Sequence, residues 1–283
     1  MPVHAAPPEL LRTAVVSIIN QRACDWELVV VEDPSDSPAG DVLQAFRDDR
    51  VRHILNETRT GQLAQRNRTL QEARGEFIAF MDADDVAHPF RLVKQLNFLR
   101  LRPEVGVVGC QIAVIDANDR IVGYRQYPVL HEDIFRAARR FVPLCQPSVM
   151  MRREVVDMYG GYEWGEVPFA LEYALWSRLL KFGVRFANLP EPLLYYRIHD
   201  RQIKLSRLHD AIRAVLRIKE LYWCDSTDVG ATLQRIGERL LLELPPRFVS
   251  WMMLRRLYHI GCVNGERIEI ECDWTSEVGG GHA

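Results

Sequence analysis

Residues 75–85 read Gly75-Glu76-Phe77-Ile78-Ala79-Phe80-Met81-Asp82-Ala83-Asp84-Asp85, and this stretch decides the fold class. The apolar run 77–81 is typical of a strand buried on both faces. Three carboxylates follow it at once, and their mutual repulsion costs free energy unless a cation lies between them. Such oxygen ligands suit Mg²⁺ or Mn²⁺, which use one or two carboxylates together with phosphate oxygens. A solvated acidic turn that caps the next helix is the alternative, and the strand context favours the metal site.

A second acidic pair has the same setting earlier in the chain. The valine-rich run 26–31 predicts another buried strand, which ends at Glu32-Asp33 and the loop 34–38. A carboxylate at a strand end can accept a hydrogen bond from a nucleobase or a ribose hydroxyl. The alternative is an aspartate that only forms the turn before Pro34.

Strand and helix patterns alternate with short links around these two runs. Helices are predicted over 10–19, 61–73 and 90–101, and a further strand over 51–55. This alternation predicts an α/β fold with a mostly parallel sheet flanked by helices. Because ligands bind beyond the carboxyl ends of strands in such sheets, both acidic clusters are expected to face one crevice.

The second half of the chain is less regular. A hairpin is predicted from 107–115 and 121–127, helices from 155–159 and 169–182, and two strands from 186–189 and 193–198. From about residue 204 the pattern is mainly helical. We therefore expect a domain over 1–204 and a helical C-terminal extension over 205–283.

Composition narrows the class of protein. The chain has 283 residues, of which 48% are hydrophobic and 26% charged, with a net charge of −2 and a pI of about 6.5. This near-neutral balance argues against a nucleic-acid partner, which basic patches would bind. No apolar run reaches the length of a spanning helix, and the start Met1-Pro2-Val3-His4 lacks the features of a secretory signal.

The six cysteines form no Cys-x-x-Cys pair, so no zinc site is expected. A chain of this length needs no disulfide, which favours a reducing compartment. Pairing of Cys262 with Cys272 across a hairpin is the alternative.

Three further features could carry function. Arg66, in a predicted helix, could reach a diphosphate bidentately, or it could be a surface arginine. Glu172 lies in an otherwise apolar helix, where desolvation would raise its pKa and suit a general base; a salt bridge to Arg178 or another cation is the alternative. The stretch 246–258 is basic and amphipathic, and it could contact a membrane surface or pack in the core.

At these residues the chain resembles the family 2 glycosyltransferases of the GT-A fold, over roughly residues 1–204. The stretch 75–85, with Pro89, Arg91, Leu92 and Gln95, is similar to the family's strand, DxD motif and following helix. Residues 26–36 and 61–67 are similar to its acidic loop and its Gly-to-Arg-Asn helix. Further landmarks lie at 146–150, 160–162 and 189–199.

The resemblance implies a GT-A nucleotide-diphospho-sugar transferase fold and inverting transfer of a sugar, assisted by Mn²⁺ or Mg²⁺. It implies nucleotide contacts from Pro2, His4, Glu32, Asp33, Arg66, Asp82 and Ala83. It implies cation ligands at Asp84, Asp82 and His199, and it implies Glu172 as the base that takes the proton of the acceptor hydroxyl. The chemistry agrees, because a divalent ion neutralises the charge that develops on a nucleotide diphosphate leaving group.

Several positions depart from the family pattern. Leu171-Glu172 stands where Glu-Asp is usual, and Ala174 replaces a usual Asp. The added methylene of a glutamate displaces the carboxylate, which matters for positioning. Pro34 and Thr69 each replace a usual glycine. Only residues 1–4 match the family's first strand, which we therefore expect to be truncated.

Three hypotheses follow. The first is an active inverting glycosyltransferase that moves a sugar, from a UDP-sugar in the first instance, to a saccharide or lipid-linked acceptor. It would act in the cytoplasm or as a peripheral protein on the inner face of the cell membrane. The second is a catalytically impaired GT-A module that binds a nucleotide or a partner. The third, a sugar-nucleotide pyrophosphorylase, is disfavoured because residues 4–8 are not a Gly-rich basic loop.

Overall fold

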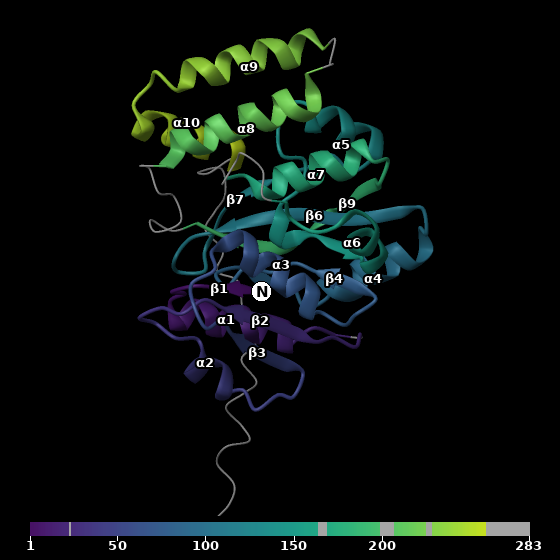
Figure 1. The fold of residues 1–283 in the computed structure, drawn as a ribbon, viewed down its shortest axis with the longest axis vertical. Coiled ribbons are helices and arrows are strands. Elements are labelled where there is room, and N and C mark those ends of the chain that lie inside the picture. Colours follow the sequence, from purple (N-terminus) through teal and green to yellow (C-terminus); the bar gives the residue numbers. More distant parts are fainter. Residues whose placement is uncertain (23, 164–168, 199–206, 225–227, 259–283) are drawn as a thin grey trace, which may run out of the picture.

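The computed structural model describes residues 1–22, 24–163, 169–198, 207–224 and 228–258, with helices and strands arranged in layers (Figure 1). Its strands form two sheets, and its last three helices lie at the end of the molecule opposite the first three strands. The α/β class is therefore confirmed.

The N-terminal sheet is parallel throughout, with the order β1-β2-β3. Its strands are β1 (Pro2–Val3), β2 (Leu28–Glu32) and β3 (Val51–Leu55). The intervening helices are α1 (Pro8–Ile19), α2 (Gly40–Gln44) and α3 (Gln62–Glu72). All five residues of β2 are buried, as its β-branched composition predicts. β1 is short, and it is joined to β2 by hydrogen bonds from Val31 N to Met1 O and from Asp33 N to Val3 O.

The second sheet is mixed, with the order β4-β8-β6-β9-β5 and with β7 paired to β6. The strands are β4 (Phe77–Ala79), β5 (Val86–Ala87), β6 (Val105–Ile115), β7 (Ile121–Arg125), β8 (Met150–Arg152) and β9 (Arg185–Arg197). Only β6 and β9 run parallel here, while the other pairs of this sheet are antiparallel. The parallel arrangement expected from the alternation thus holds for the N-terminal sheet and for the β6–β9 ladder, whereas the strand expected at 77–81 pairs antiparallel.

Helices connect and cover these strands. They are α4 (Arg91–Leu101), α5 (His131–Ala138), the 3₁₀ helix η1 (Gln146–Ser148), α6 (Arg153–Tyr159) and α7 (Leu171–Lys181). Gly160 and Gly183 follow α6 and α7 with φ of 75° and 84°, a conformation that favours glycine, so the expected helix ends are confirmed.

One prediction in this half is wrong. The strands expected at 186–189 and 193–198 are a single strand, β9, which passes through Pro190-Glu191-Pro192. The ladder with β6 shifts register at Cys110/Gln111, next to this proline segment, so the prolines are accommodated by an irregularity instead of ending the strand.

The C-terminal extension is helical where the structure describes it. It contains α8 (Leu208–Trp223), α9 (Val229–Leu241) and α10 (Pro246–Tyr258). Trp223 is buried and donates to Ser177 Oγ on α7 at 3.0 Å, so α8 shares the core of the preceding domain. The expected boundary at residue 204 lies outside the described residues.

Within the described part of the chain, no helix is both long and apolar enough to cross a membrane. The four described cysteines, Cys24, Cys110, Cys145 and Cys224, are free thiols, as expected. Cys262 and Cys272 lie outside the described residues.

Candidate functional site

The acid loop, residues 82–85, follows the carboxyl end of β4 and leads directly into β5. Its last carboxylate, Asp85, is 1% exposed and accepts a hydrogen bond at Oδ1 from the main-chain N–H of Arg197 at 2.8 Å. Burial and the charges of Asp84 and Asp82 raise the pKa of Asp85 well above its usual value. The loop therefore concentrates carboxyl groups at a point where the protein disfavours their ionisation.

Asp82 faces two groups that are remote in sequence. Burial and the charges of Asp84 and Glu172 together raise the pKa of Asp82 to about 6, against the opposing effect of Arg66. Arg66 comes from α3 and is only 7% exposed, while Glu172 comes from the first turn of α7. The fold thus brings together Asp82, Arg66 and Glu172, three of the side chains singled out in the sequence.

Arg66 is the centre of this group. Its Nη1 lies 3.5 Å from Glu172 Oε2, and its guanidinium lies 5.4 Å from the centroid of the Tyr162 ring. The Arg66 Nε is buried and donates no hydrogen bond within the described residues. A buried cation with a spare donor beside an acidic loop is suited to bind an anionic ligand.

The surroundings of Glu172 differ from the expected apolar pocket. Its side chain is 30% exposed and forms an ion pair with Arg66, so the structure has the alternative expected for this residue, a salt bridge to a cation. Arg178, the alternative partner, instead pairs with Glu163 and donates to main-chain carbonyls. The reason is that Glu172 lies at the start of the helix, where it can reach α3 and solvent.

The acidic pair at the end of β2 is already hydrogen-bonded to other groups of the protein. Asp33 is 1% exposed and accepts four hydrogen bonds, from Asn56 Nδ2 at 2.6 Å, Thr60 N at 3.1 Å, Thr60 Oγ1 at 2.9 Å and Gly61 N at 2.8 Å. Burial raises its pKa, but these hydrogen bonds outweigh that effect and lower it. A nucleobase would have to displace one of these donors.

Glu32 is likewise satisfied. Its Oε1 accepts from Ala39 N and its Oε2 contacts His53 Nε2, both at 2.8 Å. The nucleobase roles of Glu32 and Asp33 stay predictions, and the structure gives both residues a role in joining β2 to its neighbours.

Pro2, His4 and Ala83 have no direct contact with this group in the described hydrogen bonds. Pro2 belongs to β1, His4 is exposed just after it, and Ala83 is half-buried in the acid loop. Their nucleotide contacts stay predictions. His199, the third expected cation ligand, lies outside the described residues.

The acid loop fits a divalent cation that takes most of its ligands from substrate. No group of three His, Cys, Asp or Glu side chains close enough to hold a metal occurs among the described residues. Asp82 and Asp84 supply two carboxylates, the number that Mg²⁺ or Mn²⁺ uses when phosphates complete the shell. The raised pKa of Asp82 and the buried, unpaired Oδ2 of Asp85 show an excess of negative charge that a cation would offset.

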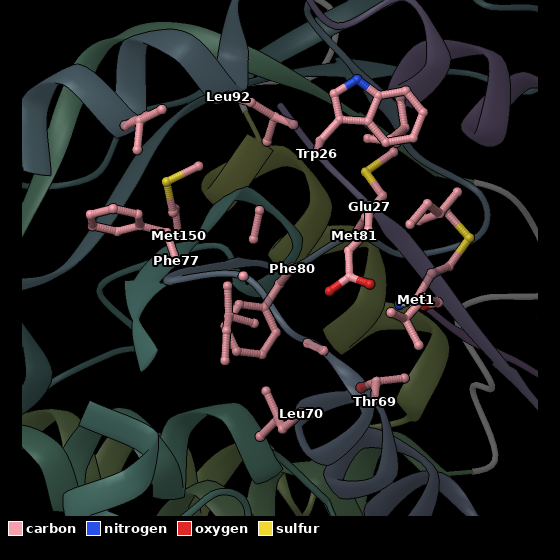
Figure 2. A pocket seen from close by; sticks show the side chains of 18 of the residues that line it. Met1, Trp26, Glu27, Thr69, Leu70, Phe77, Phe80, Met81, Leu92 and Met150 are labelled. Carbon is pink, nitrogen blue, oxygen red and sulfur yellow. Dashed lines mark hydrogen bonds between the residues drawn. The ribbon is translucent and has the colours of Figure 1, made fainter. Parts of the chain in front are cut away.

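A cavity of about 620 Å³ lies beside the site, and Figure 2 shows its mostly apolar wall. Trp26, Glu27, Phe77, Met81 and Met150 line it, from the region before β2, from the β4 segment and from β8. Arg66 and Tyr162 also line it, whereas Asp82, Asp84 and Glu172 do not. The cavity therefore reaches the charged group at Arg66 but is not lined by the three carboxylates.

Two residues of the site were missed as functional groups in the sequence. Tyr162 lies under Arg66 and contacts Gln146 Nε2 through its hydroxyl at 3.3 Å. Arg197 is buried against the acid loop. Both fall within landmark segments of the resemblance, and the only signal in the sequence was that placement.

A sheet with an acid loop at a strand end, a buried arginine and a carboxylate on a facing helix defines a glycosyltransferase of the GT-A fold. The comparisons with known proteins give the family. The model of glycosyl transferase family 2 matches residues 1–160, and the chain belongs to this family.

Relatives and solved structures agree. The O-antigen biosynthesis glycosyltransferase WbnJ of Escherichia coli is 32% identical over 202 residues, covering 69% of this chain and 77% of that protein. The mannosyltransferase PcManGT of Pyrobaculum calidifontis, solved with GDP-Man and Mn²⁺, has a TM-score of 0.61 at 16% identity and covers 87% of this chain and 69% of its own. Residues 1–349 of Staphylococcus aureus TarS, solved with UDP-GlcNAc, have a TM-score of 0.58 at 16% identity over 83% of this chain and 69% of theirs. The likeness to the solved structures confirms the fold.

Proposed function

We propose that this glycosyltransferase transfers a sugar, with inversion, from a UDP-sugar to a hydroxyl of a saccharide or lipid-linked acceptor. The observation that carries the proposal is the convergence of Asp82, Arg66 and Glu172 at the carboxyl end of β4. This reaction requires an anionic loop that binds a cation, a buried guanidinium that binds a diphosphate, and a carboxylate that accepts a proton.

The donor would be held by charge. Asp82 and Asp84 would bind the divalent cation, which when bound neutralises the negative charge that develops on the diphosphate leaving group. Arg66 would contribute a second positive charge, because its Nε is buried without a partner among the described residues. Its pKa is raised by Tyr162, Asp82 and Glu172 against the opposing effect of burial, so it stays protonated.

The acceptor would be activated by Glu172. Its Oε2 is oriented by Arg66, and its 30% exposure leaves the carboxylate within reach of a hydroxyl that enters from solvent. As the hydroxyl oxygen bonds to the anomeric carbon, its proton passes to the Glu172 carboxylate. The bond from the anomeric carbon to the diphosphate oxygen breaks on the opposite side, and the configuration at that carbon inverts.

The names of the relatives support the substrate classes. PcManGT was solved with GDP-Man and Mn²⁺ and TarS with UDP-GlcNAc, so a nucleotide-sugar donor and a divalent cation are the consistent proposal. WbnJ is named for O-antigen biosynthesis, which supports a saccharide acceptor and a role in polysaccharide synthesis. A thermal-shift screen of UDP- and GDP-sugars with and without Mn²⁺ identifies the donor, because a ligand at 100 times its Kd stabilises by about 2.7 kcal/mol.

The deciding experiment is Asp84→Ala measured by donor turnover. We expect turnover to fall at least about a hundredfold, the usual effect of removing one preorganised charge interaction. Asp157→Ala, at an exposed aspartate of α6, is the matched control and should leave turnover unchanged. Equal turnover in wild type and Asp84→Ala would overturn the proposal.

The second candidate is a GT-A module that binds a nucleotide without transfer. It is favoured by Ala174, which stands where a carboxylate is usual, and by the longer side chain of Glu172. Calorimetry with UDP and Mn²⁺ alongside donor hydrolysis separates the two. Binding with no turnover in wild type supports the second candidate; turnover that Glu172→Gln lowers by about 10²–10⁴-fold supports the first.

We also propose that the protein works in the cytoplasm, with α10 as its contact to the inner face of the membrane. Phe248 and Trp251 are 50% and 53% exposed, and their rings stack at 6.0 Å, while Val249 and Ser250 are buried. One face of the helix therefore packs in the core, and the other exposes aromatic side chains to solvent. Loss of vesicle binding in a Phe248→Ser/Trp251→Ser double variant is the expected result of a flotation assay.

A further inference from the structure

Arg197 is a buried arginine that touches the acid loop and carries no role so far. It is the last residue of β9 and is 1% exposed. Removing a guanidinium from water is costly unless its donors are paired. The hydrogen bonds and the ion pair of Arg197 therefore indicate why it is buried at this position.

Two of these contacts hold the acid loop, one at the main chain of Asp84 and one at the side chain of Asp85. Arg197 Nε donates to the carbonyl oxygen of Asp84 at 2.8 Å, and its main-chain N–H donates to Asp85 Oδ1 at 2.8 Å. The loop is also tethered just beyond its end, because Val86 of β5 pairs with Tyr195 of β9. Position 84 is thus held from its own carbonyl, one bond from the carbon that bears its side chain.

Two more contacts fix Arg197 itself. Its Nη1 donates to the carbonyl oxygen of Asp116 at 2.9 Å and pairs with Asp119 Oδ1 at 2.6 Å. Both residues lie in the turn between β6 and β7, where Asp119 adopts a φ of 62°. The turn therefore holds the guanidinium through Nη1, while Nε meets the acid loop.

We infer that Arg197 is a positioning residue: braced by the 116–119 turn, it holds the acid loop so that Asp84 presents its carboxylate to the cation. This inference rests on the proposed function, in which Asp84 binds that cation. It gives the β6–β7 turn a part in donor binding, and a flexible loop of like charges would otherwise spread apart by repulsion.

Arg152 provides a matched control. It too is a partly buried arginine that donates to main-chain carbonyls, with Nε to Val105 O at 2.9 Å and further bonds to Leu99 and Arg102. These carbonyls lie around α4 and β6, and none belongs to the acid loop. A purely structural role for Arg197 would make Arg197→Gln and Arg152→Gln behave alike.

The test measures Mn²⁺ affinity by electron paramagnetic resonance in the presence of UDP. We expect Arg197→Gln to weaken Mn²⁺ binding by about 10- to 100-fold, as loss of a residue that orients a metal ligand does. Asp119→Asn, at a partly exposed residue, should weaken it by a smaller factor in the same direction. Arg152→Gln should lower the melting temperature and leave the Mn²⁺ affinity unchanged.

Amide exchange of residues 82–86 without metal keeps the inference separate from the proposed function. We expect faster exchange in Arg197→Gln and Asp119→Asn than in Arg152→Gln. Wild-type affinity in Arg197→Gln, or an equal loss in Arg152→Gln, would overturn the inference. If wild type binds no Mn²⁺, the proposed cation site is wrong. The positioning role is then judged by amide exchange alone, and wild-type exchange rates at residues 82–86 in Arg197→Gln overturn it as well. If Arg197→Gln does not fold, Asp119→Asn decides.

Discussion

Two acidic clusters lie at strand ends in this molecule, Glu32-Asp33 at the end of β2 and 82–85 after β4, and their surroundings differ in opposite ways. Asp33 accepts four hydrogen bonds, which lower its pKa. Asp82 is half-buried beside other carboxyl groups, and its pKa rises to about 6. The first cluster is neutralised by donors from the protein, and the second keeps an excess of negative charge.

This difference separates a carboxylate that stabilises the fold from one that is available to a ligand. Hydrogen bonds to the ionised form make it a stable part of the structure, whereas repulsion and desolvation destabilise that form until a cation arrives. Under the proposed function, the same amino-acid pattern serves structure at one strand end and chemistry at the next.

Exchanging each aspartate for asparagine gives the largest expected contrast. Asp84→Asn should lower turnover at least about a hundredfold, because a neutral amide is a poorer cation ligand and offsets less charge. Asp33→Asn should lower the free energy of unfolding by about 1–3 kcal/mol, because the new NH₂ group faces donors that lose their acceptor. Turnover and urea denaturation are measured on both variants.

The KM for the donor decides between structure and binding at Asp33. If the carboxylate only joins β2 to residues 56–61, the folded Asp33→Asn protein keeps a wild-type KM. A rise in KM without a loss of stability would mean that Asp33 contacts the nucleobase, and the contrast between the two clusters would then be wrong.

The pH dependence of stability should have opposite signs at the two clusters. Because the folded-state pKa of Asp82 is raised to about 6, its destabilising effect is full above that pH and is relieved as pH falls towards its usual value. Because the pKa of Asp33 is lowered, its stabilising effect is present above its usual value and is lost as pH falls through the folded-state pKa.

Urea unfolding of wild type and two variants from pH 3 to pH 8 checks this contrast. Asp82→Asn should reduce the gain in stability between about pH 6 and pH 4, and Asp33→Asn should remove part of the acid-induced loss. Mn²⁺ binding in wild type should weaken below about pH 6, because protons compete for the same carboxylates. Because the pKa of Asp85 is raised as well, part of the gain should remain in Asp82→Asn, and a gain as large as that of wild type would contradict the assignment.

The sequence predicted the helices and strands whose residue pattern is long and uniform. It did not predict the short elements that form only because a distant segment pairs with them. The run over 26–31 contains most of β2, in which all five residues are buried, because apolar β-branched residues bury well in a sheet. The runs over 51–55 and 77–81 contain β3 and β4, but only Ile78 of these two strands is buried, so the expectation of a strand buried on both faces at 77–81 is wrong. The two-residue β5 exists only because Val86 and Ala87 find β9, more than a hundred positions away, and no local pattern marks it. β8 and α5 were missed for similar reasons, since each is short and held by its neighbours.

The site shows the same limit. The candidates Asp82, Arg66 and Glu172 could be named from their residue types and from the resemblance, and the structure brings them together. The sequence could not show that Asp33 would be saturated, because its donors Asn56, Thr60 and Gly61 reach it only through the fold of the next strand and loop. Nor could it show that Arg197 would be turned inward.

The smallest expected effect concerns the backbone that carries Glu172. Ala170, just before α7, has a φ of 54°, in the left-handed region that costs a non-glycine residue about 1–2 kcal/mol. Ala170→Gly removes this cost and adds unfolded-state entropy of about 0.5–1 kcal/mol, so the free energy of unfolding should rise by about 1 kcal/mol or less. Ala117→Gly, at an exposed turn residue without positive φ, is the control and should lower it. Because strain of this kind collects at active sites, where the surrounding structure holds it, Ala170→Gly should also lower kcat severalfold by loosening the start of the helix. A lower free energy of unfolding in Ala170→Gly than in wild type would mean that the backbone at residue 170 is not strained.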